Sequence, residues 1–218
     1  DLAPTFLELA GIDEKASGMQ PITGKSMTDI FYTSKRGQVN PDRNYVLIGK
    51  ERHDVGRPHD WGYPIRGIVK DGYLYIHNFE TERWPAGNPE TGYLNCDGSP
   101  TKTVCLEARK KPGQEQFWQW SFGKRPADEL YHIKNDPDCL SNLAEHLGFA
   151  DLKKKLKDQL FAALKEQGDP RMFGQGHIFD SYPYAHDINR GFYERYQAGE
   201  NIQAGWVNKS DFEPDFPN

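Results

Sequence analysis

A glycine-punctuated stretch, residues 49–66, gathers the side chains that are best suited to bind a ligand. Within it stand three arginines, two histidines and two large aromatic residues: Arg52, His53, Arg57, His59, Trp61, Tyr63 and Arg66. Arginine pairs with oxyanions in bidentate geometry, and aromatic rings supply flat packing surfaces. His53 adds a hydrogen-bonding group that can transfer protons near neutral pH. The stretch therefore predicts a binding loop.

The same residues also have structural interpretations. Arg52, His53 and Arg57 are equally typical of a solvated turn, and Arg66 is typical of an ion pair on a strand. The remaining histidines and tryptophans fit a sheet surface or a core better than a binding site. They are His59, His77, His132, Trp84, Trp118 and Trp120.

Strand-like segments flank the loop and position its ends. Short β-branched and aromatic runs alternate in polarity, and Asp71-Gly72 supplies a tight turn between two of them. The predicted strands are 44–48, 65–69, 73–77 and 129–133. These runs indicate an antiparallel sheet of about four strands.

A long amphipathic helix is predicted over 151–167. Leu152, Leu156, Leu160 and Leu164 recur every fourth residue, lysines cover the opposite face, and Gly168 ends the pattern. The helix is expected to lie on one face of the sheet. The fold class is then α+β: a small antiparallel sheet packed against a long C-terminal helix, with long irregular loops.

Other segments are shorter or less regular. Helices are predicted over 2–10, with Asp1 as N-cap and an apolar stripe, and over 26–32. Residues 80–125 predict irregular structure apart from a short helix near 114–120, and the tail after 170 is expected to wrap the surface.

Composition excludes several classes of protein. The net charge is -5 and the pI is near 5.8, which argues against binding of nucleic acid. No apolar run approaches the ~20 residues that cross a bilayer, and no signal segment opens the sequence, so a soluble chain is predicted. A mean hydropathy of -0.83 indicates much surface and loop.

The three cysteines leave the redox setting open. Cys96 and Cys105 enclose a short loop whose closure by a disulfide would contribute about 2–3 kcal/mol and would suit a periplasmic or extracellular protein. Three free thiols, Cys139 included, are an equal alternative. No CxxC pair or histidine cluster accompanies them, so no metal site is predicted.

Short motifs run in order along nearly the whole chain. DLAPTFLELAGI (1–12), PITGKS (21–26), ELYHIKNDP (129–137) and NLA (142–144) resemble C-terminal landmarks of the formylglycine-dependent sulfatases. KERH (50–53), YPIR (63–66), NF (78–79), RWPAG (83–87) and DGSP (97–100) resemble, more narrowly, the heparan N-sulfatase (sulfamidase) branch.

This resemblance implies hydrolysis of sulfate esters or sulfamates on glycans such as the N-sulfoglucosamine of heparan sulfate. The family uses a formylglycine made within a Cys/Ser-X-Pro-X-Arg motif, beside a calcium ion. No segment here fits that motif, because 105–109 has Glu107 in place of proline and 181–185 lacks arginine. The nucleophile and calcium are therefore expected in an N-terminal catalytic α/β domain, and this fragment alone is expected to be inactive and to bind no cofactor.

The resemblance also implies an organisation in three parts. Residues 1–43 would end the catalytic domain, 44–168 would form the C-terminal sulfatase subdomain, and 169–218 the tail. His53, Arg66, Arg52, Arg57 and Tyr63 are expected to bind the sulfated saccharide, with His53 and Arg66 at the mouth of the pocket. The saccharide and the catalytic domain would be the partners, in a periplasmic or secreted protein, or a lysosomal one in a eukaryote.

Two other functions stay open. The aromatic and arginine content, together with the missing nucleophile, also suits a stand-alone carbohydrate-binding module. A related phosphonate or phosphodiester hydrolase is the second alternative, because the C-terminal parts of such enzymes look alike.

Overall fold

The computed structural model describes residues 1–216 of the chain, which divides into two compact units, Asp1–Val46 and Leu47–Asn218. The first unit contains α1 (Leu2–Leu9), α2 (Thr28–Phe31) and a 3-10 turn at Glu14–Ser17. Both predicted N-terminal helices are present, although α2 is shorter than the predicted 26–32.

The apolar stripe of α1 is exposed at Leu2, Phe6 and Leu9. Its one buried residue is Thr5, whose hydroxyl donates to the Asp1 carbonyl and accepts from the Met27 backbone amide. Polar contacts, more than apolar packing, therefore hold α1 to the loop that follows it.

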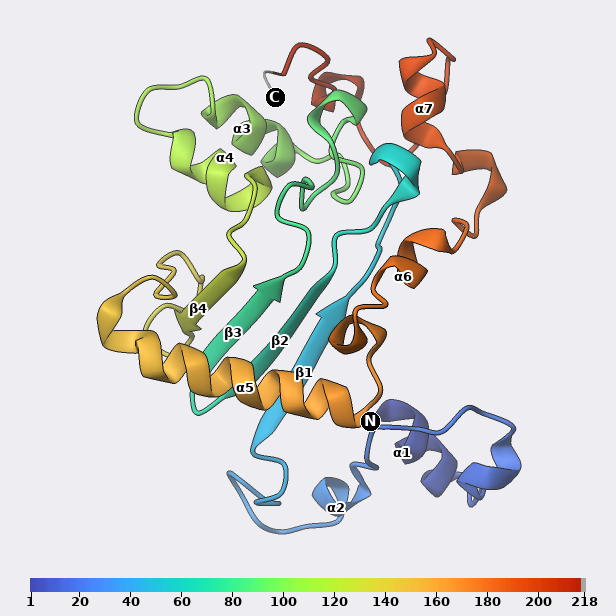
Figure 1. Cartoon of the computed structure of the whole chain (residues 1–218), viewed down its shortest axis with the longest axis vertical. Helices are drawn as coiled ribbons and strands as arrows, with labels where there is room; N and C mark the ends of the chain where they lie inside the picture. The colour runs from blue at the N-terminus through green and yellow to red at the C-terminus, as the bar shows by residue number, and fades with distance from the viewer. Residues whose placement is uncertain (217–218) are drawn as a thin grey trace. The chain divides into compact units, whose positions relative to one another are not determined.

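A four-strand antiparallel sheet dominates the second unit (Figure 1). Its strands, in spatial and sequence order, are β1 (Tyr45–Lys50), β2 (Ile65–Lys70), β3 (Tyr73–Asn78) and β4 (Asp128–His132). Asp71 and Gly72 form the turn between β2 and β3 with positive φ angles of 51° and 80°, as the two-residue hairpin requires. The predicted α+β fold and its meander are confirmed.

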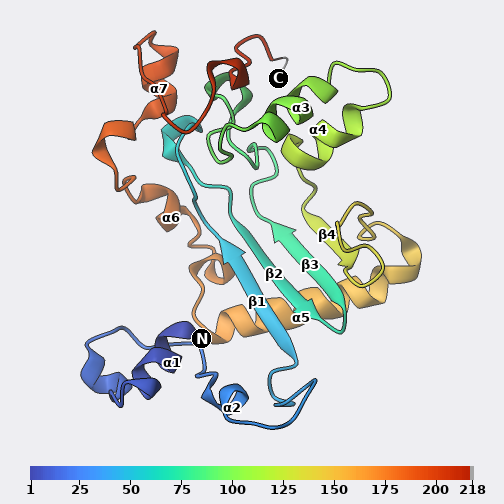
Figure 2. The ribbon, with the colours of Figure 1, turned by 180° about the vertical axis from the view of Figure 1, so that it is seen from behind.

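The long helix α5 (Ala150–Glu166) lies across one face of the sheet (Figure 1). Its predicted leucine stripe is buried at Leu156, Leu160 and Leu164. These side chains pack in one cluster with Ile68 and Tyr75 of the sheet, and with Leu130 and Ala144. Seen from behind, the strands lie in front of α5, and no helix of the described part of the second unit crosses this second face (Figure 2).

Asp128, at the start of β4, joins the sheet to α5 through polar contacts. Its carboxylate lies 2.6 Å from Tyr75 Oη, 2.9 Å from His77 Nδ1 and 3.1 Å from Lys157 Nζ. Burial by itself raises the pKa of Asp128, but the hydrogen bonds from Tyr75, His77 and Lys157 outweigh burial and lower the pKa to about 2.

This lowered pKa predicts a loss of stability in acid. Since the unfolded value is about 3.9, ionised Asp128 stabilises the fold above about pH 4, and the contribution disappears as the pH falls through 2. We expect Asp128→Asn to lower the free energy of unfolding by about 1–2 kcal/mol at pH 7, reduced for solvent screening. Urea denaturation at pH 7 and pH 2 measures this. A gap of equal size at both pH values would contradict the titration of Asp128.

Two helices occupy the region predicted to be mostly irregular. They are α3 (Pro100–Ala108), which was not predicted, and α4 (Glu115–Phe122), which agrees with the helix predicted near 114–120. Ser99 caps α3 by accepting a hydrogen bond from the Lys102 amide, and Pro100 is its first residue. The helical periodicity of apolar residues did not predict α3, because this helix has few apolar residues and one of them, Val104, is exposed.

The tail after residue 170 contains helices and part of a core, which sequence reasoning also missed. It forms α6 (His177–Ser181) and α7 (Phe192–Gln197), and Phe192 and Ala204 pack with Val55 and Leu94 in a second apolar cluster. Single 3-10 turns make up the remaining helical structure: Pro58–Asp60, Pro89–Thr91, Leu147–Phe149, Pro170–Phe173, Asp187–Asn189 and Lys209–Asp211.

Candidate functional site

The 50–66 loop leaves the sheet at the end of β1 and returns at the start of β2, two neighbouring strands. Its two ends approach closely, because a Cβ atom on Gly62 would lie 2.2 Å from the carbonyl oxygen of Glu51. Only glycine permits that approach without a shift of the backbone. The loop is therefore a closed, well-defined turn on the rigid sheet.

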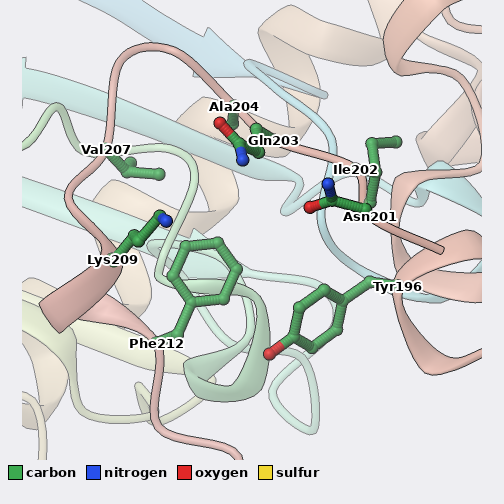
Figure 3. A pocket seen from close by; sticks show the side chains of 8 residues that line it. All are labelled: Tyr196, Asn201, Ile202, Gln203, Ala204, Val207, Lys209 and Phe212. Atoms are coloured by element: carbon green, nitrogen blue, oxygen red, sulfur yellow. The ribbon is translucent and has the colours of Figure 1, made fainter. Parts of the chain in front are cut away.

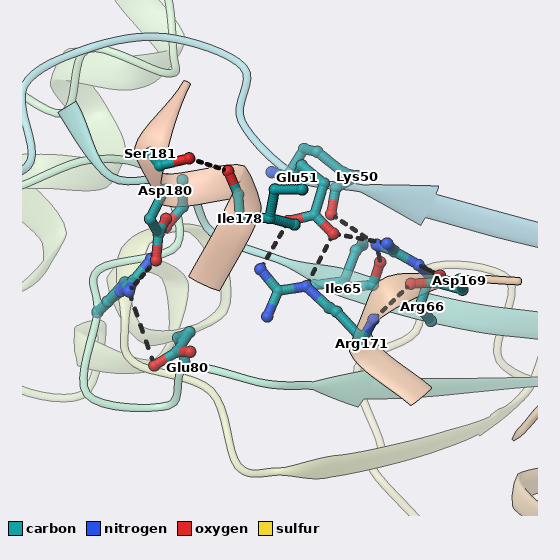
Figure 4. A network of polar contacts seen from close by, with 12 residues as sticks. Lys50, Glu51, Ile65, Arg66, Glu80, Asp169, Arg171, Ile178, Asp180 and Ser181 are labelled. Carbon is teal, nitrogen blue, oxygen red and sulfur yellow. Dashed lines mark hydrogen bonds and ion pairs between the residues drawn. The ribbon is translucent and has the colours of Figure 1, made fainter. Parts of the chain in front are cut away.

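An ion-pair network ties the loop to the segment after α5 (Figure 4). Glu51 pairs with Arg66 at 2.6 Å and with Arg171 at 2.7 Å, and Arg66 also pairs with Asp169 at 2.6 Å. Arg66 is only 8% exposed. The alternative interpretation of Arg66, a structural ion pair, is thus present in the fold. Through this pair the Arg66 side chain positions the loop.

Arg57, another of the residues predicted to bind the saccharide, lies inside the fold. It is 1% exposed, and its guanidinium donates to the carbonyl oxygens of Trp84 at 2.7 Å and Pro85 at 2.9 Å. Burial and the neighbouring charge of Arg83 lower the pKa of Arg57 to about 10, so it remains cationic at neutral pH. Arg57 holds the 84–85 segment against the loop. Its positive charge lies beside the Tyr63 ring.

The other two predicted polar residues lie nearer the surface. Arg52 donates to the carbonyl oxygens of Asp60, Tyr182 and Pro183, so it fastens the loop to the tail. His53 is exposed and makes no hydrogen bond or ion pair with the described residues. Of the predicted set, His53 is thus the polar side chain most accessible to a ligand from outside.

A cavity of about 310 Å³ opens beside the loop, on the face of the sheet opposite α5. Lys50 and Tyr63 line it, together with apolar side chains of β2 and β3 and with Asn78, Arg125, Glu129 and Asp138. Glu129 accepts hydrogen bonds from Asn78 and Tyr131 and lies 4.0 Å from Arg125. Most of the polar lining is therefore paired with other protein groups.

Among the hydrogen-bond donors of this Lys50–Tyr63 cavity, Lys50 and Tyr63 are the exceptions, and the Asp138 carboxylate likewise has no hydrogen bond or ion pair with the described residues. Tyr63 is 2% exposed and its hydroxyl has no hydrogen-bond partner among the described residues. The Lys50 ammonium has no carboxylate or carbonyl partner within residues 1–216, and burial and then the charge of Arg57 lower its pKa. Lys50 and Arg57 each lie 5.9 Å from the Tyr63 ring centroid. Lys50, the Arg57 charge behind the ring and the free hydroxyl favour an anion at the Tyr63 end of the cavity, while the Glu129 and Asp138 carboxylates also belong to the lining.

Sequence reasoning missed two residues of this region, Lys50 and Arg83. Arg83 stacks on Trp61 at 4.6 Å and makes a bidentate contact with Asp180 at 2.8 and 3.0 Å. Both residues belong to motifs that resemble the sulfamidase branch: Lys50 to KERH and Arg83 to RWPAG. Membership in these motifs was the sequence signal that could have identified them.

The disulfide considered for Cys96 and Cys105 is not formed. Both are free thiols, as is Cys139, and the Cys96 Sγ donates to the Asp97 carbonyl oxygen at 3.8 Å. Cys96 and Cys105 instead pack around the Tyr93, Leu106 and Phe122 cluster. Burial raises the pKa of Cys96, which makes it a poor thiolate.

Within residues 1–216, no group of three or more His, Cys, Asp or Glu side chains is placed to hold a metal ion. The described helices include none that is long and apolar enough to span a membrane.

Comparison with known proteins gives matches over most of the chain. No family model matches it. An ulvan-active sulfatase of Formosa agariphila is 28% identical over 169 residues, which cover 78% of this chain and 29% of that protein. The chain is homologous to sulfatases. A second ulvan-active sulfatase of the same organism is 27% identical over 78% of this chain and 25% of its own length.

Among solved structures, one in complex with its substrate D-glucosamine-2-N,6-O-disulfate covers 78% of this chain and 24% of its own, with 17% identity and a TM-score of 0.47. The sulfatase-like chain spans less than a third of the length of the curated relatives it matches.

Proposed function

We propose that this chain is the C-terminal part of a sulfatase and that the 50–66 loop and the Lys50–Tyr63 cavity form one wall of its substrate site. The reaction would be hydrolysis of a sulfate ester or sulfamate on a sulfated glycan, such as the N-sulfoglucosamine of heparan sulfate. Similarity to sulfatases over 78% of the chain supports the reaction class. The branch motifs that contain Lys50 and Tyr63 support the choice of sugar.

The pair of unpartnered donors carries this proposal. An oxyanion has oxygens enough to accept from both the Lys50 ammonium and the Tyr63 hydroxyl, and charge-assisted hydrogen bonds are the strong ones. Neither donor is drawn away by a protein acceptor among the described residues. His53, exposed on the same loop, would contact a part of the saccharide that lies further out.

The remaining machinery would come from a preceding domain. A formylglycine supplies the nucleophile of such enzymes and calcium supplies charge stabilisation, but no cluster of metal-ligating side chains occurs within the described residues. We therefore propose an N-terminal catalytic α/β domain as the partner of this chain. Because a polymeric anionic glycan does not cross membranes, the protein would be periplasmic or secreted, or lysosomal in a eukaryote.

Tyr63→Phe in the full-length enzyme tests the proposal most cleanly. The change removes only a hydroxyl that bonds to no described residue, so the free energy of unfolding should not fall. If that hydroxyl binds the substrate, kcat/KM should drop about tenfold on N-sulfated glucosamine or on an ulvan oligosaccharide. Lys50→Met should lower kcat/KM about 10–100-fold, because a charged donor is lost. His53→Ala should lower kcat/KM on the saccharide and leave a small aryl sulfate unaffected, whereas an equal loss on both substrates would mean that His53 acts in the chemistry.

Matched controls are Tyr32→Phe and Lys155→Met, both at exposed positions. These controls should retain the kcat/KM of the parent enzyme on every substrate. Unchanged kinetics of Tyr63→Phe and Lys50→Met on both saccharide and aryl sulfate would sink the proposal. Arg66→Ala is a poor probe, because it breaks a buried ion pair and would unfold the loop before it reports on binding.

A further inference from the structure

The tail of the chain forms a second pocket, of about 280 Å³, that has no part in the site described above (Figure 3). All of its lining lies within 196–212: Tyr196, Asn201, Ile202, Gln203, Ala204, Val207, Lys209 and Phe212. We propose that this tail pocket is an accessory saccharide-binding site that takes one sugar unit carrying an anionic substituent.

Aromatic and aliphatic side chains make up one part of the tail pocket. The rings of Tyr196 and Phe212 lie 5.3 Å apart between centroids and are tilted by 41°, and Ile202 and Val207 add aliphatic surface. Ring faces and methyl groups suit the C–H face of a pyranose, which is apolar while its edge carries hydroxyls. A volume near the lower limit of ligand pockets fits one sugar ring better than a larger ligand.

The polar side chains of the pocket match the edge of a sugar. Asn201 and Gln203 each offer an amide donor and an amide acceptor, and within residues 1–216 neither side chain is engaged in a hydrogen bond. Lys209 is exposed and has no ion pair with the described residues. Two free amides suit neutral hydroxyls, and the single ammonium suits a sulfate or carboxylate group.

The pocket is held in shape before any ligand arrives. Trp206 Nε1 donates to the Leu94 carbonyl oxygen at 2.9 Å, and Asp211 pairs with the buried Lys102 at 3.2 Å. Asn208 and Asp211 exchange backbone and side-chain hydrogen bonds as a capping box around the 3-10 turn. A segment fixed at both Trp206 and Asp211 loses little freedom on binding, which favours affinity.

The tail pocket is also attached to the 50–66 loop. The His59 amide donates to Glu194 on α7 at 2.7 Å, the Gly191 amide donates to Asp60 at 2.7 Å, and Val55 packs against Phe192. One glycan chain could therefore bind both at the Lys50–Tyr63 cavity and at the tail pocket. The tail pocket would contribute affinity and no chemistry.

Binding of a heparin-derived hexasaccharide to the 218-residue chain, measured by titration calorimetry, tests this inference. Asn201→Ala with Gln203→Ala should weaken binding about tenfold, since two exposed amides are removed without disturbing the core. Lys209→Gln should weaken binding of the sulfated hexasaccharide several-fold and leave its desulfated counterpart unaffected.

Lys155→Gln, at an exposed position of α5, is the matched control and should leave the affinity unchanged. Equal losses in Lys209→Gln and Lys155→Gln would show non-specific charge attraction and would overturn the inference, as would full affinity in the amide double variant. The outcome is separate from the proposed function, because Tyr63→Phe and Lys50→Met should leave tail-pocket binding intact even though they lower the kcat/KM of the full-length enzyme.

Discussion

Asp211→Asn is expected to lower the free energy of unfolding by about 3–5 kcal/mol. Asp211 and Lys102 form an ion pair in which both side chains are 0% exposed. Lys102 Nζ also donates to the carbonyl oxygens of Gly92 and Cys96 at 2.8 and 2.7 Å. Without the carboxylate, the ammonium would remain buried with neutral acceptors alone, which do not compensate its charge.

Equilibrium urea denaturation measures the effect of Asp211→Asn. Lys111→Met, which breaks an exposed pair with Glu107, is the control and should change stability by less than about 1 kcal/mol. The double variant Lys102→Met/Asp211→Leu should recover most of the loss, because it leaves no unpaired charge. A change below about 1 kcal/mol for Asp211→Asn would show that the pair is hydrated, contrary to the structure.

Glu51→Gln is expected to lower the free energy of unfolding by about 2–4 kcal/mol, somewhat less than a fully buried pair because Glu51 retains some contact with solvent. Its two carboxylate oxygens serve Arg66 and Arg171, and the Arg171 side chain is only 5% exposed. A neutral amide would leave Arg171 without a carboxylate partner. It would also free the start of the 50–66 loop, so limited proteolysis should cut within 51–64 faster.

Glu80→Gln is the matched control for Glu51→Gln. Glu80 lies 3.8 Å from Arg83 and is more exposed, while Arg83 keeps its pair with Asp180, so stability should hardly change. Adding Arg171→Met to Glu51→Gln should restore part of the stability, because the uncompensated guanidinium is removed. If Glu51→Gln left both the unfolding midpoint and the proteolysis of the loop unchanged, the network would not be what fixes the loop.

Local patterns were sufficient for the sheet and its covering helix. The leucine stripe of α5 and the Asp71-Gly72 turn between two alternating strands are short-range patterns, and both predicted the observed elements. α3 was missed although Ser99 and Pro100 give a start signal, since its apolar residues do not follow a helical period. The tail was missed because the residues of its core, such as Phe192 and Ala204, meet Val55 and Leu94 only in space.

By itself, the sequence determined that a loop rich in cations and aromatic rings leaves a small antiparallel sheet, and that its motifs are those of sulfatases. Only the tertiary structure decided which of the loop's cations lacks a carboxylate or carbonyl partner among residues 1–216. Arg66 and Arg57 look as available in sequence as Lys50, but Asp169 and the 84–85 carbonyls occupy them. A charge is neutralised by the groups that the fold brings within a few ångströms. The local sequence around Arg66 cannot indicate Asp169, which is 103 residues away in the chain.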